Sequence, residues 1–183
     1  MANHPVIDDL RNDHRAMKAM FGVIDEEMTA FSSGEHTDFE RLLAAVEYCH
    51  AYPGAKHHPK EDIVFLYLKI RDADAAVKIG DLSAEHEILA DYTRRFKSAI
   101  ERILHGENIV RDQLKKLADD YTAFLNRHMQ TEETIFFPVA LATLTEDDWA
   151  VVANDIGNLR DVSLDPALEV RLQKIRDIVV EAN

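Results

Sequence analysis

The sequence predicts an all-α protein, an antiparallel four-helix bundle with additional short helices at its C-terminal end. Apolar residues recur at helical spacing, as in the series Leu10, Met17, Phe21, Ile24 and Met28. No segment shows the sustained alternation of apolar and polar residues that marks a half-buried strand. The long periodic segments are joined by short connections, and short connections join antiparallel neighbours in a bundle.

Each helix has its own local justification. The periodic segments predict helices over residues 5–31, 38–68, 72–79, 83–104, 110–141, 146–156 and 166–181. Pro5 suits the first turn of the first helix, where no amide donor is required. Ser83 is expected to cap the helix that begins there. Pro53 and Pro59 predict a kink or interruption within 38–68, because proline lacks the amide donor of a helical hydrogen bond.

The length of the chain, 183 residues, suits one well-packed domain. We expect a four-helix bundle over residues 1–143 and a helical extension over residues 144–183 that packs on the bundle as part of the same domain. The single cysteine, Cys49, cannot form an internal disulfide, which agrees with a reducing compartment.

Composition excludes several classes of function. Acidic residues outnumber basic ones by 34 to 21, giving a formal net charge of −13, which disfavours a nucleic-acid partner. No apolar run approaches the roughly 20 residues that span a bilayer. The N-terminal segment lacks the basic and apolar regions of a signal peptide. We therefore expect a cytoplasmic protein without a nucleic-acid or membrane partner; the oligomeric state stays open.

Two His-x-x-x-Glu pairs indicate a metal site. They are His57/Glu61 and His128/Glu132, and each precedes an apolar stretch that contains phenylalanine. Positions i and i+4 lie about 40° apart around a helix axis, so the two side chains of a pair face the same way. An imidazole and a carboxylate inside an apolar core need compensation, which a metal ion supplies. The nearby prolines make this spacing argument weaker for the first pair than for the second.

Histidines on the remaining long helices complete a candidate site. His14 and His86 lie where their neighbours predict an inward face. The predicted metal ligands are His14, His57, Glu61, His86, His128 and Glu132. Imidazole and carboxylate ligands suit iron, manganese or zinc, and helical bundles build dinuclear centres in this way. Taken singly, each histidine also fits a buried core residue hydrogen-bonded to a neighbour.

Three other histidines are considered as ligands or as peripheral residues. His58 is an alternative to His57, because His58 and Asp62 have the same i,i+4 spacing. His36 lies in a polar turn and is expected to be exposed to solvent. His50 ends a Glu-x-x-His element, which ferritin-like di-iron bundles use on two helices. The chain has no second copy of that element, so we expect His50 to be peripheral.

Four short strings resemble the hemerythrin-like (HHE cation-binding) family. They lie at residues 12–17, 57–62, 85–86 and 128–138, and the last reads His-Met-x-x-Glu-Glu-x-x-Phe-Phe-Pro. The resemblance covers about the first 140 residues. It implies a four-helix bundle with two iron ions, oxo- or hydroxo-bridged, in which Glu61 and Glu132 span both ions and the histidines are terminal ligands. Members bind or sense oxygen or redox state, or handle iron and nitrosative stress.

One position departs from the oxygen-carrying members of that family. They have two histidines four residues apart on the third helix, whereas here Ala90 follows His86 at that spacing. The resemblance then implies an open position beside one ion and a ligand set like that of the family's di-iron repair-type members. We expect a protein that binds, senses or reduces oxygen, peroxide or nitric oxide. Alternatives are a di-iron oxidase, peroxidase or iron-handling or repair enzyme, and a structural bundle with adventitious zinc; manganese is a further possible metal.

Overall fold

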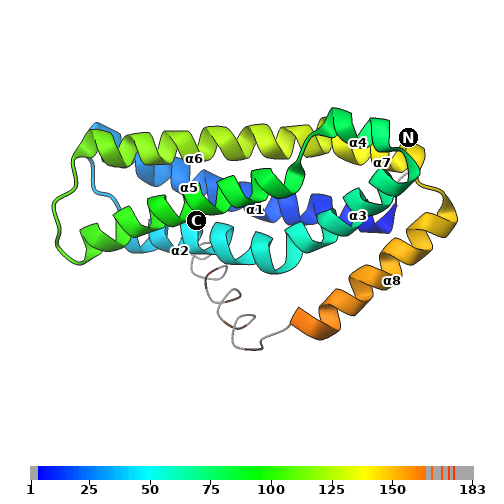
Figure 1. Cartoon of the computed structure of the whole chain (residues 1–183). Coiled ribbons are helices and arrows are strands. Elements are labelled where there is room, and N and C mark those ends of the chain that lie inside the picture. The colour runs from blue at the N-terminus through cyan, green and yellow to red at the C-terminus, as the bar shows by residue number, and fades with distance from the viewer. Residues whose placement is uncertain (1–3, 164–165, 167–169, 171–172, 174, 176–183) are drawn as a thin grey trace.

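The computed structural model describes residues 4–163, 166, 170, 173 and 175 (Figure 1). Every regular element among these residues is helical, which confirms the all-α prediction. The helices are α1 (Pro5–Ser33), α2 (Phe39–Tyr52), α3 (His58–Arg71), α4 (Ala73–Ile79), α5 (Leu82–Leu104), α6 (Arg111–Thr131), α7 (Phe137–Thr143) and α8 (Glu146–Ser163). Two π-helical turns, η1 (Pro53–His57) and η2 (Glu132–Phe136), join α2 to α3 and α6 to α7.

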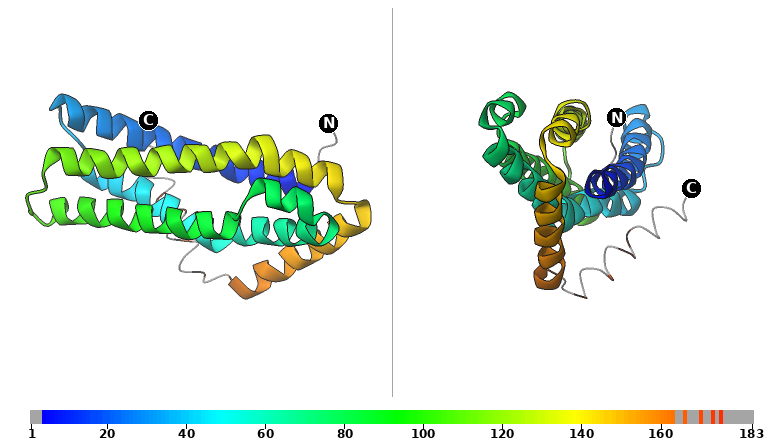
Figure 2. Two further views of the ribbon diagram at one scale, coloured as in Figure 1. Left: turned by 45° about the horizontal axis from the view of Figure 1, so that its top comes forward. Right: turned by 90° about the vertical axis from the view of Figure 1, so that its right-hand side faces the viewer.

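The long elements form four rods that lie side by side (Figures 1 and 2). The rods are α1, α2 continued through η1 into α3, α5, and α6 continued through η2 into α7. Helix α1 packs on α2, α2 on α5, α5 on α6, and α6 on α1, so the rods enclose a common interior. The short helix α4 packs on α3, and α8 turns back after α7 to contact α3.

Capping residues explain where several helices begin and end. The His4 side chain accepts a hydrogen bond from the Val6 amide, and α1 ends at Gly34 with a φ of 76°, which favours glycine. The prediction that Ser83 caps α5 is wrong. The Asp81 side chain accepts from the Ala84 amide at 3.1 Å, because a carboxylate two residues earlier reaches the free amides of the first turn.

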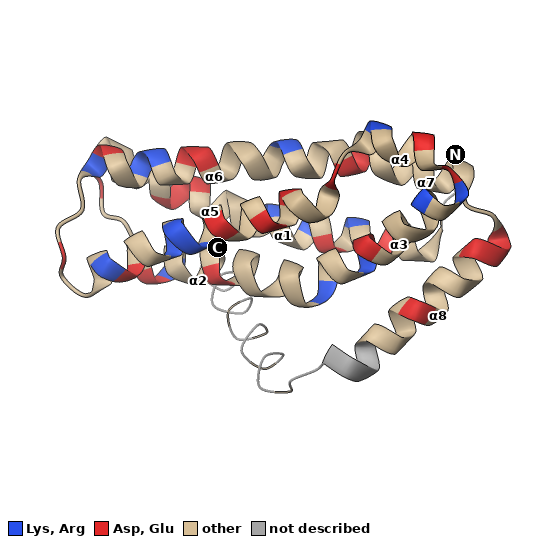
Figure 3. Ribbon diagram, in the orientation of Figure 1, with Lys and Arg blue, Asp and Glu red and all other residues tan. Residues whose placement is uncertain are grey.

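The C-terminal helices differ from the expected bounds. Helix α8 continues to Ser163, beyond the predicted end at residue 156. The predicted helix over 166–181 lies largely outside the described residues. No helix among the described residues is long and apolar enough to cross a membrane. Acidic and basic residues are both scattered along the rods (Figure 3).

The two π-helical turns occur where prolines disturb the helical hydrogen bonding. Turn η1 closes with the His58 amide donating to the Pro53 carbonyl, and η2 with the Phe137 amide donating to the Glu132 carbonyl. A proline follows each closing residue in the sequence. A proline ring collides with the carbonyl four residues earlier, and the extra residue of a π turn relieves that collision. The kink predicted near Pro53 is therefore a widened turn within a continuous rod.

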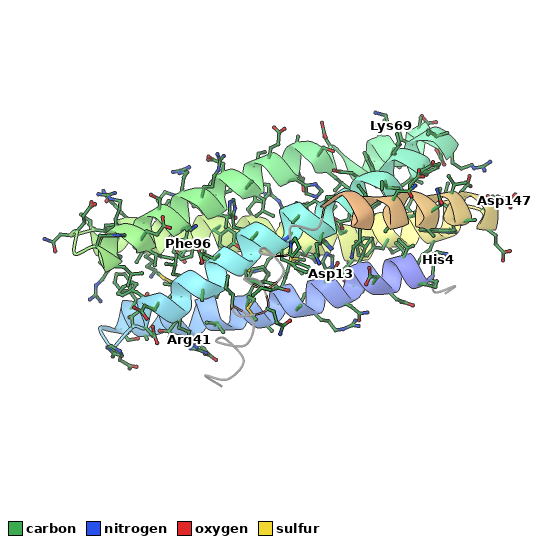
Figure 4. The ribbon with its side chains drawn as sticks, turned by 90° about the horizontal axis from the view of Figure 1, so that it is seen from below. His4, Asp13, Arg41, Lys69, Phe96 and Asp147 are labelled. Atoms are coloured by element: carbon green, nitrogen blue, oxygen red, sulfur yellow. The ribbon has the colours of Figure 1, made fainter. Side chains whose placement is uncertain are left out.

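Two buried apolar clusters fill the interior. The α2 cluster includes Val46, Phe96 and Tyr121, and the α8 cluster includes Phe136 and Trp149. Histidines and carboxylates lie between the clusters on every rod, and Figure 4 labels Asp13 in this intermediate position between Phe96 and His4. The flanking apolar residues are Met17 and Leu10 on the first rod, Cys49 and Val64 on the second, Leu89 and Leu82 on the third, and Leu125 and Phe136 on the fourth.

Helix α8 packs on the rest of the protein through Trp149, Val152 and Ile156, all buried in the α8 cluster, and through polar contacts. Trp149 is 5% exposed and stacks on the ring of His4, with centroids 4.2 Å apart. Tyr67 donates a hydrogen bond to Asp155 at 2.8 Å, and Arg71 pairs with Asp148 at 2.7 Å. The expected division into residues 1–143 and 144–183 within one domain stays a prediction.

Truncating Trp149 should destabilise the protein. We expect W149A to lower the free energy of unfolding by about 3 kcal/mol, because removal of a buried indole loses apolar contact and leaves a cavity. The measurement is chemical denaturation followed by circular dichroism. V151A, which truncates a side chain of α8 that is 45% exposed, is the matched control. Equal midpoints for the two variants would contradict a packing role for Trp149.

Candidate metal centre

The structure brings all six predicted ligands together in the interior, between the α2 cluster and the α8 cluster. They come from all four rods, and none is more than 8% exposed. Ligand atoms of His14, His57, Glu61 and Glu132 lie within 4.8 Å of one another. A second such group consists of His58, His86 and His128. Glu61 and Glu132 are completely buried.

Glu132 lies between imidazoles of two different rods. Its Oε2 atom is 3.2 Å from Nε2 of His14, and its Oε1 atom is 2.9 Å from Nε2 of His128. The second contact is the i,i+4 pair predicted from the sequence. Burial opposes the charged form of Glu132, but the imidazoles of His128 and His14 outweigh it and hold the pKa of Glu132 well below its usual value.

Glu61 has the same arrangement on the second rod. Its Oε1 atom is 3.3 Å from Nε2 of His57, and its Oε2 atom is 3.5 Å from Nε2 of His86. The His57/Glu61 pair thus makes its i,i+4 contact even though η1 ends at His57. The Nε2 atoms of His14 and His57 are 3.1 Å apart, which brings the two carboxylate groups into one cluster.

The opposite nitrogen of each imidazole faces a further carboxylate. The distances from Nδ1 are 2.8 Å for His14 to Glu133, 3.4 Å for His57 to Asp13, 3.7 Å for His86 to Asp62, and 2.8 Å for His128 to Glu85. We call these four the outer carboxylates. In His14, His57 and His128 a hydrogen bond to the carboxylate at Nδ1 fixes the tautomer and orientation of the ring, so Nε2 is directed toward the interior. Asp62 faces Nδ1 of His86 from beyond hydrogen-bond distance.

The outer carboxylates form a closed cycle around the rods, and sequence analysis missed them. Each is the sequence neighbour of a predicted ligand but contacts a histidine of the next rod. Consecutive helical residues differ by about 100° around the axis, so the neighbour of an inward residue points sideways toward an adjacent helix. The available signal was an acidic residue beside four of the predicted ligands: Asp13, Asp62, Glu85 and Glu133.

Asp13 has the most extensive hydrogen bonding of the outer carboxylates. It accepts hydrogen bonds from Tyr52 and from Lys60 Nζ, the latter at 2.9 Å. Burial would raise the pKa of Asp13, but hydrogen bonds from His57, Tyr52 and Lys60 outweigh burial and hold it below its usual value. The charged carboxylate therefore maintains the orientation of His57.

The cluster without a metal favours charged imidazoles. Burial opposes the charge of His57, but Glu61 and the hydrogen bond to Asp13 raise the pKa of His57 to about 10. Burial likewise opposes the charge of His86, and contacts with Glu132 and Glu61 raise its pKa to about 9. Protons on these rings occupy the place that a cation would take, since a metal binds the neutral imidazole.

The three further histidines singled out from the sequence lie in different surroundings. His36 is exposed, as predicted, and His50 is half-buried outside both ligand groups. His58 was considered as an alternative to His57, yet both face the cluster. Burial and the neighbouring imidazoles of His86 and His57 lower the pKa of His58 to about 2.

The six residues fit a pair of metal ions. Among the described residues, no hydrogen bond of good geometry reaches the side-chain oxygens of Glu61 and Glu132, or Nε2 of His86 and His128. Such buried atoms cost about 1–3 kcal/mol each when they lack partners. Two ligand atoms at right angles on an ion, with bonds of about 2.1 Å, lie about 3 Å apart. The nitrogen–oxygen distances in this cluster have that spacing.

A small cavity adjoins the cluster on the side of the α2 cluster. Its polar lining comes from four histidines and Glu132, and the rest is apolar. The apolar lining residues are Met17, Phe21, Cys49, Pro53, Leu89, Leu125 and Met129. Burial raises the pKa of Cys49 to about 12, so its thiol stays protonated. The cavity therefore suits a small uncharged molecule.

The fold and the cluster together define a helical bundle able to hold metal. The family model described as Hemerythrin HHE cation binding domain matches residues 6–140, a range that contains all six predicted ligands. The chain belongs to this family, which confirms the resemblance seen in the sequence. No curated protein and no solved structure matches the chain.

Metal binding should release protons into the buffer. His57 and His86 have pKa values of about 10 and about 9 without metal, so both are protonated at neutral pH and must lose a proton to bind an ion. We expect metal affinity to rise as the pH increases from about 6 to about 8. Calorimetric titration in buffers of different ionisation enthalpy measures the protons released. Heats that do not depend on the buffer would contradict this expectation.

Neutralising an outer carboxylate should weaken metal binding. In E85Q the amide can still accept a hydrogen bond from His128, but it no longer raises the basicity of the ring. We expect affinity to fall about 10- to 100-fold, the usual effect of such partners. E87Q, an exposed position on the same helix, is the control and should bind like the wild type. Equal affinities in the two variants would assign Glu85 no role in orienting His128.

Proposed function

We propose that this protein holds two iron ions within a hemerythrin-like antiparallel four-helix bundle, and that it binds, senses or reduces oxygen or small oxidants such as peroxide and nitric oxide. One observation carries the proposal. Two fully buried carboxylates each lie between imidazoles of two different rods, next to a small apolar cavity. Surface ion pairs do not require such burial, whereas a carboxylate-bridged pair of ions does.

Each residue has a definite part in this proposal. Glu61 and Glu132 would hold the two ions jointly, because each offers two oxygens toward imidazoles of different rods. His14, His57, His86 and His128 would supply nitrogens to them. The outer carboxylates hold a proton on Nδ1 and leave Nε2 free for an ion. Iron bound in such a site supplies one-electron chemistry and open positions for a small ligand.

The surroundings select the ligand. The apolar lining that includes Met17, Phe21 and Leu125 favours a small uncharged molecule over bulk water. Since the thiol of Cys49 stays protonated, redox chemistry in this cavity depends on the metals rather than on a thiolate. A net charge of −13 favours a small-molecule ligand over nucleic acid, and the lone buried cysteine supports a cytoplasmic location.

Metal content and the visible spectrum of protein purified without added metal test the proposal. We expect two iron ions per chain and a visible band from the ferric pair. Both should be lost in E132A, which removes a bridging carboxylate, and retained in E87A. Steady peroxide turnover that disappears in E132A would establish the enzyme alternative, whereas stoichiometric binding would indicate a sensor or carrier.

Two outcomes contradict the iron centre. The first is iron-loaded protein that retains no iron and has no visible band. The second is zinc as the sole metal, with metal content and melting temperature unchanged in H57A and H128A. Ligand loss should lower the melting temperature of the metal-bound protein, because a metal that binds the folded state at 100 times its dissociation constant stabilises that state by about 2.7 kcal/mol.

A further inference from the structure

An imidazole outside the six-residue set lies directly against it. His58 is the first residue of α3, between His57 and Pro59, and it is half-buried. Its ring stacks on that of His86, with centroids 3.7 Å apart and planes 7° apart. Its centroid is 6.2 Å from that of His128, and those two rings are nearly perpendicular. His58 therefore meets two proposed ligands that come from different rods.

We propose that His58 is a seventh metal ligand, the third imidazole of the ion bound by His86 and His128. This inference rests on the proposed dinuclear centre and adds one ligand to it. The second rod then contributes neighbouring imidazoles to both ions: His57 to one and His58 to the other. The position beside Ala90 that we expected to be open is instead supplied with a nitrogen from another rod.

The distances allow three imidazoles to share an ion. Each of the three rings offers a nitrogen, and these nitrogens lie within 4.8 Å of one another. Around one ion with bonds of about 2.1 Å, three ligand nitrogens lie about 3.4 Å apart in a tetrahedral arrangement. A contraction of up to about 1.4 Å is therefore needed, together with a rotation of the His58 ring out of its parallel stack on His86, and both are side-chain movements.

A structural role for His58 accounts less well for its surroundings. A histidine kept for stability is usually fixed by a hydrogen bond from a ring nitrogen to a neighbouring polar group. Within the described part of the chain, the contacts of His58 are with the rings of His57, His86 and His128. Placing an imidazole among imidazoles becomes favourable when they share a cation.

The η1 turn explains why two consecutive residues both face the cluster. In an α-helix, neighbouring side chains diverge by about 100° around the axis. The π turn ends at His57, and the following Pro59 keeps His58 at the junction between the turn and α3. At this junction His57 reaches Glu61 and Asp13, while His58 reaches His86 on the third rod.

Titration with Co²⁺ of the wild type and of two His58 variants tests this inference. Phenylalanine retains a ring that can stack on His86 but has no nitrogen. In H58F we expect one of the two Co²⁺ ions to bind at least about 10-fold more weakly, because losing only a hydrogen-bond partner of a ligand already weakens binding that much. The visible bands of that ion should also change. H58A should show the same loss, and added imidazole should restore its bands. H36F, at an exposed histidine, should match the wild type.

The outcomes separate this inference from the proposed function. Wild-type affinity and bands in H58F overturn the inference whatever H58A shows, because stacking then accounts for the ring. Loss in H58F without loss in H58A also overturns it, since the bulk of phenylalanine would be the cause. Fewer than two Co²⁺ ions in the wild type contradict the dinuclear centre instead. In that case, altered visible bands of the one bound ion in H58F would support the inference, and unchanged bands would overturn it.

Discussion

The structure depends on the mutual compensation of buried imidazoles and carboxylates. Burying a charged imidazole or carboxylate without a partner costs several kcal/mol. Glu61 and Glu132 avoid that cost only because four imidazoles, one from each rod, surround them. The alignment of the four rods is therefore determined at this level of the interior, since sliding one rod by a helical turn would leave charges unpaired. The apolar clusters on either side exclude water and strengthen these interactions.

The outer carboxylates extend this compensation into a cycle that includes every rod. Each rod supplies a carboxylate to the histidine of the next, so no rod positions its own imidazole through Nδ1. The orientation of each metal-facing nitrogen thereby depends on the packing of two helices. Such coupling makes the geometry of the cluster a property of the assembled bundle, and it links metal affinity to folding.

The residues differ in how far sequence could predict them. The His57/Glu61 and His128/Glu132 pairs were visible because i,i+4 spacing is a local property of helices. The capping of α5 was mispredicted, since Asp81 and Ser83 are both competent caps and only the position of the first turn distinguishes them. The outer carboxylates and the stack of His58 on His86 join residues of different rods, which no local pattern encodes.

The sequence by itself determined the helical periodicity, the family, and the six residues with metal-ligand chemistry, because each of these follows from residue type and short-range spacing. The tertiary structure decided which imidazole meets which carboxylate, the widened turns before Pro59 and Pro138, and the closeness of His58 to the cluster. The physical reason is that these features depend on the rotation and axial position of whole helices. Packing of the apolar clusters determines both quantities, and no segment of the chain determines them alone.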